Sequence, residues 1–288
     1  MRKNFRKILS MMVIIAGVVL LFYPFMSEYL FEHRIDSEIN TYQKAVHEIS
    51  SEIYEQMMMD AQAYNKKLTQ SKVKLTDPFV ETDETSGHMV YEELLNLDRT
   101  GIMGYIEIPA ISVYLPVFHG TSSVTLERGA GHLKGTSLPI GGESTHSVLT
   151  GHTGMNKARL FTDLTELEAG DMFFVHVLGN TLAYEIYEID IVLPEDISKL
   201  GIRQGEDIVT LVTCTPYSIN THRLLVHGKR ADCSEEKYEK IIEIGSKGTD
   251  SQWMRSYQKA IFFGLLITAV LFLIMLLLSK ISVKLRGK

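Results

Sequence analysis

The sequence predicts a mostly β fold: a closed or nearly closed β-barrel with short helices, preceded by helical segments and flanked by two membrane-spanning helices. Three observations predict it. From about Gly104 onward, short runs rich in β-branched and aromatic residues are separated by clusters of Gly, Pro and Ser, as strands are by turns. From Phe25 to Asp77 there is no Gly or Pro, and apolar residues recur at helical spacing. Near each end of the chain, twenty consecutive positions carry no charge.

Each short run has the length and composition of one strand, and the short connections favour a mostly antiparallel sheet. The runs are GYIEIP, VYLPVF, HSVLTG, MFFVHVL, TLAYEIYEIDIVL, DIVTLVTC and THRLLVHG. The longest, from Thr181 to Leu193, contains two apolar sets in opposite phase. One strand cannot bury both sets on the same face without a bend, so we predict a bulge near Ile186 and Tyr187.

The N-terminal helical stripe alternates steps of four and three residues. Its members are Ile35, Ile39, Tyr42, Val46, Ile49, Ile53 and Met57. This spacing predicts one or two helices that pack on a neighbouring surface, or a coiled-coil dimer, because the pattern suits either use. The stripe ends before Pro78, which cannot continue a helix.

The two uncharged stretches, 8–27 and 260–279, are each long enough for a transmembrane helix. Lys and Arg precede the first stretch and follow the second, so both tails are expected in the cytoplasm. The sequence therefore predicts a two-pass protein of the cell membrane with its catalytic domain on the extracellular face. A cleaved signal peptide is the alternative for the first stretch.

The charge distribution argues against nucleic acid as a partner. The chain has a formal net charge of −6, and every Asp and Glu lies between the two uncharged stretches. The composition shifts predict the following segments: a cytoplasmic tail at 1–7, a transmembrane helix at 8–27, a helical segment at 28–76, a connector at 77–100, the β-barrel at 101–230, a polar linker at 231–259, a transmembrane helix at 260–279 and a cytoplasmic tail at 280–288.

Two cysteines are present, and only one has the setting of a nucleophile. Cys214 follows the apolar run IVTLV and precedes Thr215 and Pro216, which end strand pairing, so its thiol is expected at the rim of the sheet. Cys233 lies in the charged stretch ADCSEEK and has no assigned role. A disulfide between them, or a purely structural thiol at 214, are the alternatives.

A histidine and an arginine are candidate partners of this thiol. His152 lies in TGHTG, directly after a predicted strand, where glycines leave the ring uncrowded. Arg223 lies on the strand after Cys214, and antiparallel pairing across the turn would place it beside the thiol, where it could donate hydrogen bonds to an oxyanion. An ordinary strand arginine is the alternative. Neither HExxH nor CxxC occurs, so we expect no metal site and no cofactor.

These motifs, taken together, resemble the signature of the sortases. TLVTCTP is followed nine residues after its cysteine by the arginine of INTHRLLVHGKR, and THSVLTGHTG lies upstream. The likeness covers roughly Gly101 to Arg230 and implies a sortase-type β-barrel. It implies that Cys214 is the nucleophile, that His152 protonates the leaving amine and that Arg223 stabilises the oxyanion. Many relatives have Arg after the histidine, where Thr153 stands here.

Two further features resemble the class C, or pilus-assembly, sortases. One is the hydrophobic segment near the C-terminus. The other is the triplet Asp77, Pro78 and Phe79, which resembles the lid of that class. In the family the aspartate would pair with Arg223 and the aromatic ring would cover Cys214. A plain helix stop is the alternative for the triplet.

The resemblance implies a transpeptidase that cleaves an LPxTG-like sorting signal on a pilin or surface protein. A thioester acyl-enzyme would then pass the peptide to an acceptor lysine of another pilin, which leaves an isopeptide bond. A housekeeping sortase that joins proteins to a peptidoglycan amine is the near alternative. A non-enzymatic surface scaffold and a secreted cysteine hydrolase are the more distant ones.

Overall fold

The computed structural model describes residues 2–70, 75–80, 88–154, 160–246, 257–268 and 270. The chain divides into two units, Met1–Lys247 and Gly248–Lys288. In the second unit the described residues are helical. The first unit contains the barrel and every residue singled out above as a candidate for chemistry.

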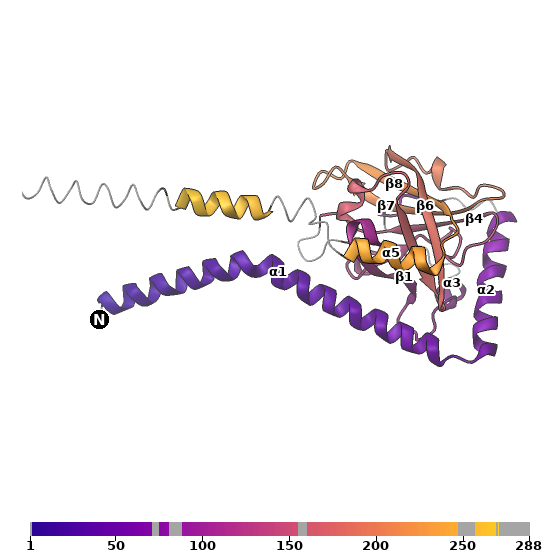
Figure 1. The fold of residues 1–288 in the computed structure, drawn as a ribbon, viewed down its shortest axis with the longest axis horizontal. Coiled ribbons are helices and arrows are strands. Elements are labelled where there is room, and N and C mark those ends of the chain that lie inside the picture. The colour runs from indigo at the N-terminus through magenta and orange to yellow at the C-terminus, as the bar shows by residue number, and fades with distance from the viewer. Residues whose placement is uncertain are drawn as a thin grey trace, which may run out of the picture. The chain divides into compact units, whose positions relative to one another are not determined.

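Eight strands close into a barrel in the order β1-β2-β3-β4-β7-β8-β6-β5, which confirms the β-barrel of the predicted fold class (Figure 1). The strands are β1 (Ile102–Ile108), β2 (Val113–His119), β3 (Ala130–His132), β4 (Thr145–Thr150), β5 (Met172–Val177), β6 (Asn180–Val192), β7 (Asp207–Thr215) and β8 (His222–Arg230). Neighbouring pairs are antiparallel except β2 with β3 and β4 with β7. The predicted bulge is present, since the register of β6 against β8 shifts between Ile186 and Glu188.

Helices precede, interrupt and follow the strands. The α-helices are α1 (Arg2–Glu48), α2 (Ser51–Gln70), α3 (His88–Glu93), α4 (Ser123–Leu126) and α5 (Glu235–Ser246), and the short 3-10 helices are η1 (Pro109–Ile111), η2 (Thr162–Glu166) and η3 (Ser198–Leu200).

The N-terminal stripe packs on the barrel over its first half. Ile35, Ile39 and Tyr42 are almost fully buried, and the Tyr42 hydroxyl donates to the Met103 carbonyl at 3.0 Å. Farther along the stripe Ile53 is half exposed, because the chain turns between α1 and α2. Helix α2 docks through its own residues. The Asn65 amide of α2 pairs with both backbone groups of one residue in the loop between β3 and β4.

The region expected to be a polar linker, 231–259, begins with a helix that packs on the barrel. In α5, Tyr238, Ile241 and Ile242 lie against an apolar patch of β5 and β6. The Tyr238 hydroxyl also donates to a carboxylate oxygen of Glu107 on β1 at 3.0 Å. The high share of charged residues concealed this apolar face, whose members recur at steps of three and one.

The two predicted membrane spans require a correction. Within the residues that the structure describes, no helix combines the length and apolar character needed to cross a membrane. Residues 8–27 are part of α1, which continues as one helix through charged sequence to Glu48. Within 260–279 the described helical positions are 260–268 and 270. Because no described helix has the length and apolar character that a span requires, the prediction of a two-pass membrane protein with an extracellular catalytic domain is wrong.

Candidate active site

Strand register brings His152, Cys214 and Arg223 to one level of the barrel. The parallel ladder of β4 and β7 ends with Thr150 opposite Val212, and His152 and Cys214 each follow two residues later. On the other side of β7, Cys214 is directly opposite Arg223 of β8. Adjacent strands are about 4.8 Å apart, so the three predicted residues come from three neighbouring strand positions at the barrel rim.

The chain around His152 is fixed by backbone contacts. The Gly151 N–H donates to the Val212 carbonyl at 3.0 Å, and the Thr213 hydroxyl donates to the Gly151 carbonyl at 2.7 Å. A side chain at Gly151 would lie 2.6 Å from the Phe161 ring, so the close approach requires glycine. These contacts join the end of β4 to β7 and hold the backbone of His152 beside that of Cys214. Thr213 was not among the residues predicted from the sequence; its position in TLVTC, one residue before the cysteine, is the signal that could have identified it.

Arg223 is paired with Asp77. Its Nε donates to Asp77 Oδ1 at 2.9 Å and its Nη2 to Asp77 Oδ2 at 2.6 Å. Its Nη1 donates to the Asn220 and His222 carbonyls, at 3.2 and 3.1 Å. The two charged side chains are 11% and 8% exposed. The guanidinium therefore faces the thiol side with its bidentate edge already occupied by a carboxylate.

Phe79 covers the same end of the barrel. Its ring centroid lies 4.9 Å from the Arg223 Cζ and 5.8 Å from the centroid of the His152 ring. Together with Leu75, it packs on an apolar cluster of the outer barrel face that includes Val212 and Leu225. We call residues 75–80 the cover segment. Pro78 does not itself end α2, because that helix ends at Gln70.

Burial shifts both titratable groups toward their neutral forms. It raises the pKa of the Cys214 thiol; the nearby Arg223 charge lowers that pKa and the Asp77 charge raises it. Burial lowers the pKa of His152, against a smaller opposing influence of Glu127. Both shifts favour the neutral thiol and imidazole over the thiolate and imidazolium.

The second cysteine, Cys233, lies just before α5. Both cysteines are free, so the disulfide alternative is wrong. Cys233 packs at the edge of the α5 contact, and its thiol donates to the Ser234 carbonyl at 3.6 Å.

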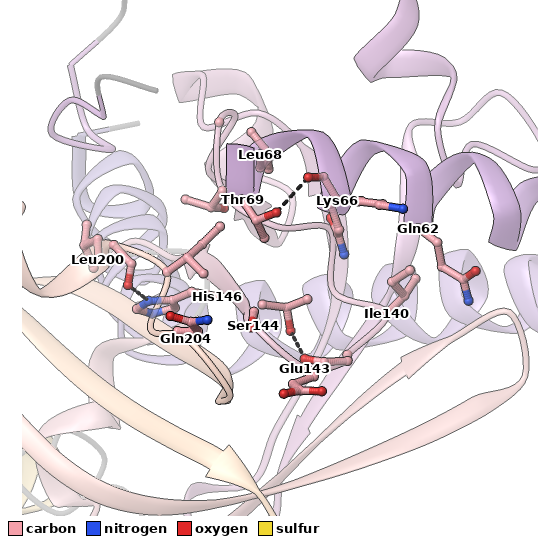
Figure 2. A pocket seen from close by; sticks show the side chains of 18 of the residues that line it. Gln62, Lys66, Leu68, Thr69, Ile140, Glu143, Ser144, His146, Leu200 and Gln204 are labelled. Atoms are coloured by element: carbon pink, nitrogen blue, oxygen red, sulfur yellow. Dashed lines mark hydrogen bonds between the residues drawn. The ribbon is translucent and has the colours of Figure 1, made fainter. Parts of the chain in front are cut away.

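A cavity of about 1060 Å³ lies between α2 and the loops at the ends of β3, β4 and β6. Figure 2 shows Lys66 and Thr69 of α2 on one wall, with Ser144 and His146 on the other. None of the three candidate catalytic residues lines it, although Leu75 of the cover segment does. The candidate active site is thus separate from this cavity.

The chain is similar to known proteins in sequence and in structure. Residues 106–231 match the family model described as the sortase domain. The structure is similar to sortase C-1 from Actinomyces oris, with 47% identity, a TM-score of 0.59, and coverage of 62% of this chain and 98% of that chain. It is similar to sortase C1 of Streptococcus agalactiae, with 39% identity, a TM-score of 0.64, and coverage of 71% of this chain and 99% of that chain.

The chain is also similar to curated sortases that are not of class C. The chain is 33% identical to Sortase D of Bacillus subtilis over 130 residues, which are 44% of this chain and 63% of that protein. It is 26% identical to Sortase A of Bacillus anthracis over 227 residues, 79% of this chain and 95% of that protein. Strand order, the matched domain and these relatives lead to one conclusion: the chain belongs to the sortase family of cysteine transpeptidases.

Proposed function

We propose that this sortase polymerises pilins. Cys214 attacks the carbonyl carbon between Thr and Gly of an LPxTG-like sorting signal, and the peptide is held as a thioester. A lysine amine of another pilin then attacks the thioester and leaves an isopeptide bond. The observation that carries the proposal is the cover segment, in which Asp77 occupies Arg223 and Phe79 lies over the reactive end. The similar solved structures of class C sortases support the same assignment.

The proposed proton path starts from a neutral pair. As the Cys214 sulfur bonds to the carbonyl carbon, the thiol proton passes to the His152 imidazole. The imidazolium then gives that proton to the leaving glycine amine as the C–N bond breaks. In the second half of the reaction His152 accepts a proton from the attacking lysine amine, and the thiol is restored. Protons and charges balance over the cycle without a further reactant.

Arg223 is proposed to stabilise the tetrahedral oxyanion once Asp77 has left it. Its Nε and Nη2 donate to the two carboxylate oxygens of Asp77, and an oxyanion needs donors of the same kind. Substrate binding and release of the Asp77 pair would therefore be coupled. While the cover segment is in place, Phe79 keeps water from the thioester side of the site and the Arg223 charge is neutralised.

A mass measurement tests the proposed function. The full chain is incubated with a sorting-signal peptide and either a pilin that carries the acceptor lysine or a wall-precursor amine. We expect a thioester adduct on Cys214 and an amide-linked product with the pilin. Product with the wall-precursor amine alone would instead indicate a housekeeping sortase. Free acid alone would indicate a hydrolase, and the absence of any adduct would leave only a binding scaffold.

A further inference from the structure

A second group of chemically capable side chains lies on the outer face of the barrel, away from Cys214. Glu188 and Asp190 of β6 and His227 of β8 have ligand atoms that all lie within 4.8 Å of one another. Glu188 is directly opposite His227, and Asp190 is two residues along the same face. His227 is four residues from Arg223 on β8, which corresponds to about 13 Å along the strand. The proposed transpeptidation uses none of these three residues.

A chain of hydrogen bonds fixes which nitrogen of His227 carries the proton. His146 Nδ1 is 2.9 Å from the Gly201 carbonyl, which only accepts, so Nδ1 carries the proton and Nε2 of the neutral ring accepts. The Thr210 hydroxyl, 2.6 Å away, must donate to that Nε2. The Thr210 oxygen then accepts from His227 Nδ1 at 2.7 Å. His227 Nε2 is therefore left as an unprotonated nitrogen with a lone pair.

That lone pair lies near a carboxylate. His227 Nε2 lies 3.4 Å from Asp190 Oδ2, and it has no hydrogen-bond partner among the residues that the structure describes. The His227 side chain is 0% exposed. Two acceptors that face each other in a buried position repel, and a cation between them converts the repulsion into attraction. The arrangement of Nε2 and the two carboxylates is the donor set of a metal site.

Lys199 of η3 supplies part of the missing positive charge. Its ammonium lies 2.6 Å from Asp190 Oδ2 and 2.8 Å from Glu188 Oε1. An ammonium has only donors, so it can satisfy the carboxylates, and His227 Nε2 remains without a donor. Arg203 approaches Glu188 more loosely, at 3.7 Å. Lys199 is 33% exposed, so its flexible side chain can leave the group for solvent.

We propose that Glu188, Asp190 and His227 bind a divalent transition-metal ion such as Zn²⁺ or Mn²⁺, in competition with the Lys199 ammonium. One imidazole nitrogen and two carboxylates suit these ions, and the two carboxylates balance the 2+ charge. Glu188 and Asp190 are 36% and 23% exposed, which gives the ion a path from solvent. Thr210 serves as the outer partner that orients the ligand ring. Burial also lowers the pKa of His227, which keeps the imidazole neutral, as a ligand must be.

Calorimetric titration of the full chain with zinc chloride, and separately with manganese chloride, tests the site. Wild type should bind one ion saturably. His227→Gln should weaken that binding by more than about tenfold, since it removes the nitrogen ligand. Lys199→Met should tighten it by about tenfold, because the competing ammonium is gone. His33→Gln, an exposed histidine of α1, is the matched control and should bind as wild type does.

Opposite results would overturn the site. Wild-type affinity in His227→Gln would assign the bound ion to other groups, including the thiols. Weaker binding in Lys199→Met would show that the lysine supports the ion rather than competing with it. If His227→Gln does not fold, the double variant Glu188→Gln and Asp190→Asn removes the oxygen ligands at partly exposed positions. Unchanged affinity in that variant, or no saturable binding by wild type and Lys199→Met, would also contradict the proposal.

Discussion

The outer face of β4, β7, β8 and β6 has two ends that contain the same kinds of side chain in opposite states. At the polar end, the rings of His146 and His227 are tied through the Thr210 hydroxyl. At the reactive end, the ring of His152 makes no hydrogen bond to the part of the chain that the structure describes, and its neighbour is the ring of Phe79 at 5.8 Å. An apolar row that includes Val212 and Leu225 separates the two ends.

This difference shows how one barrel face can be rigid at its polar end and reactive at the other end. At the polar end, hydrogen bonds from within the barrel fix the tautomers of both rings, and only His227 Nε2 has no hydrogen-bond partner among the described residues. The reactive end is completed by a segment outside the barrel, residues 75–80, and in the proposed function substrate displaces this segment. A proton shuttle needs a ring whose nitrogens are free to exchange, and of His146, His152 and His227 only His152 has neither ring nitrogen in a hydrogen bond to the described residues. Each substitution proposed for one end is compared with a substitution at the other end or at a neighbouring residue.

The largest effect is expected from Cys214→Ala. It removes the proposed nucleophile, so transpeptidation should fall by about 10⁴-fold or more, and no thioester adduct should form. Product formation with the sorting peptide and amine, followed by mass spectrometry, measures both. Cys233→Ala is the matched control, because it removes the other free thiol and should retain activity. Continued polymer formation by Cys214→Ala would remove the nucleophile assignment.

Arg223→Lys should lower kcat/KM by about 10² to 10³-fold, as expected for the loss of an oxyanion donor. Lysine keeps the charge but loses the two-pronged geometry that Arg223 presents to Asp77. Arg230→Lys, at the exposed end of the same strand, provides the comparison and should stay near wild type. If Arg223→Lys retained full activity, positive charge alone would suffice and the directed donor role would be lost.

The pH dependence of thiol alkylation should report the raised pKa of Cys214. In a Cys233→Ala background, the rate with iodoacetamide should rise about tenfold per pH unit through neutrality and level off only above the ordinary thiol pKa of about 8.5. The sign follows from burial, which disfavours thiolate, while the lowered pKa of His152 leaves little imidazolium to pair with it. A plateau already reached below pH 7 would instead indicate a resting thiolate–imidazolium pair.

The cover segment should protect the thiol by a smaller factor. The double change Asp77→Asn and Phe79→Ala removes a charge that raises the pKa of Cys214 and a ring that lies over the site. Alkylation at pH 7 should therefore become several-fold faster. Val80→Ala is the matched control, since Val80 is exposed in the same segment. An unchanged alkylation rate in the double variant would contradict a lid at these residues.

The sequence predicted the reactive end better than its supports. Cys214, His152 and Arg223 each end or begin a recognisable strand, so register alone brings them together. The Asp77 pair came from a family resemblance, because no local pattern links residues that are far apart in the chain. Thr213 and Gly151 lie next to predicted residues, but the contacts that give them their roles are tertiary, and charged residues concealed the apolar face of α5. The membrane spans were predicted from uncharged composition alone, and no helix of the described residues has the length and apolar character of a span.

The smallest effects should come from two buried threonines of β7. Thr210 lies at the polar end of the face and Thr213 lies beside the reactive end. Thr213→Val removes the hydrogen bond to the Gly151 carbonyl, and Thr210→Val removes the link between two imidazole rings. Each should cost about 1 to 3 kcal/mol of unfolding free energy, because buried partners lose their hydrogen bond.

Thr213→Val should also reduce kcat several-fold, since His152 follows Gly151 directly, whereas Thr210→Val should reduce it less. Thr213→Ser, which keeps the hydroxyl, should restore kcat. Equal losses of kcat in both valine variants at equal stability would show that the two ends of the face are not independent.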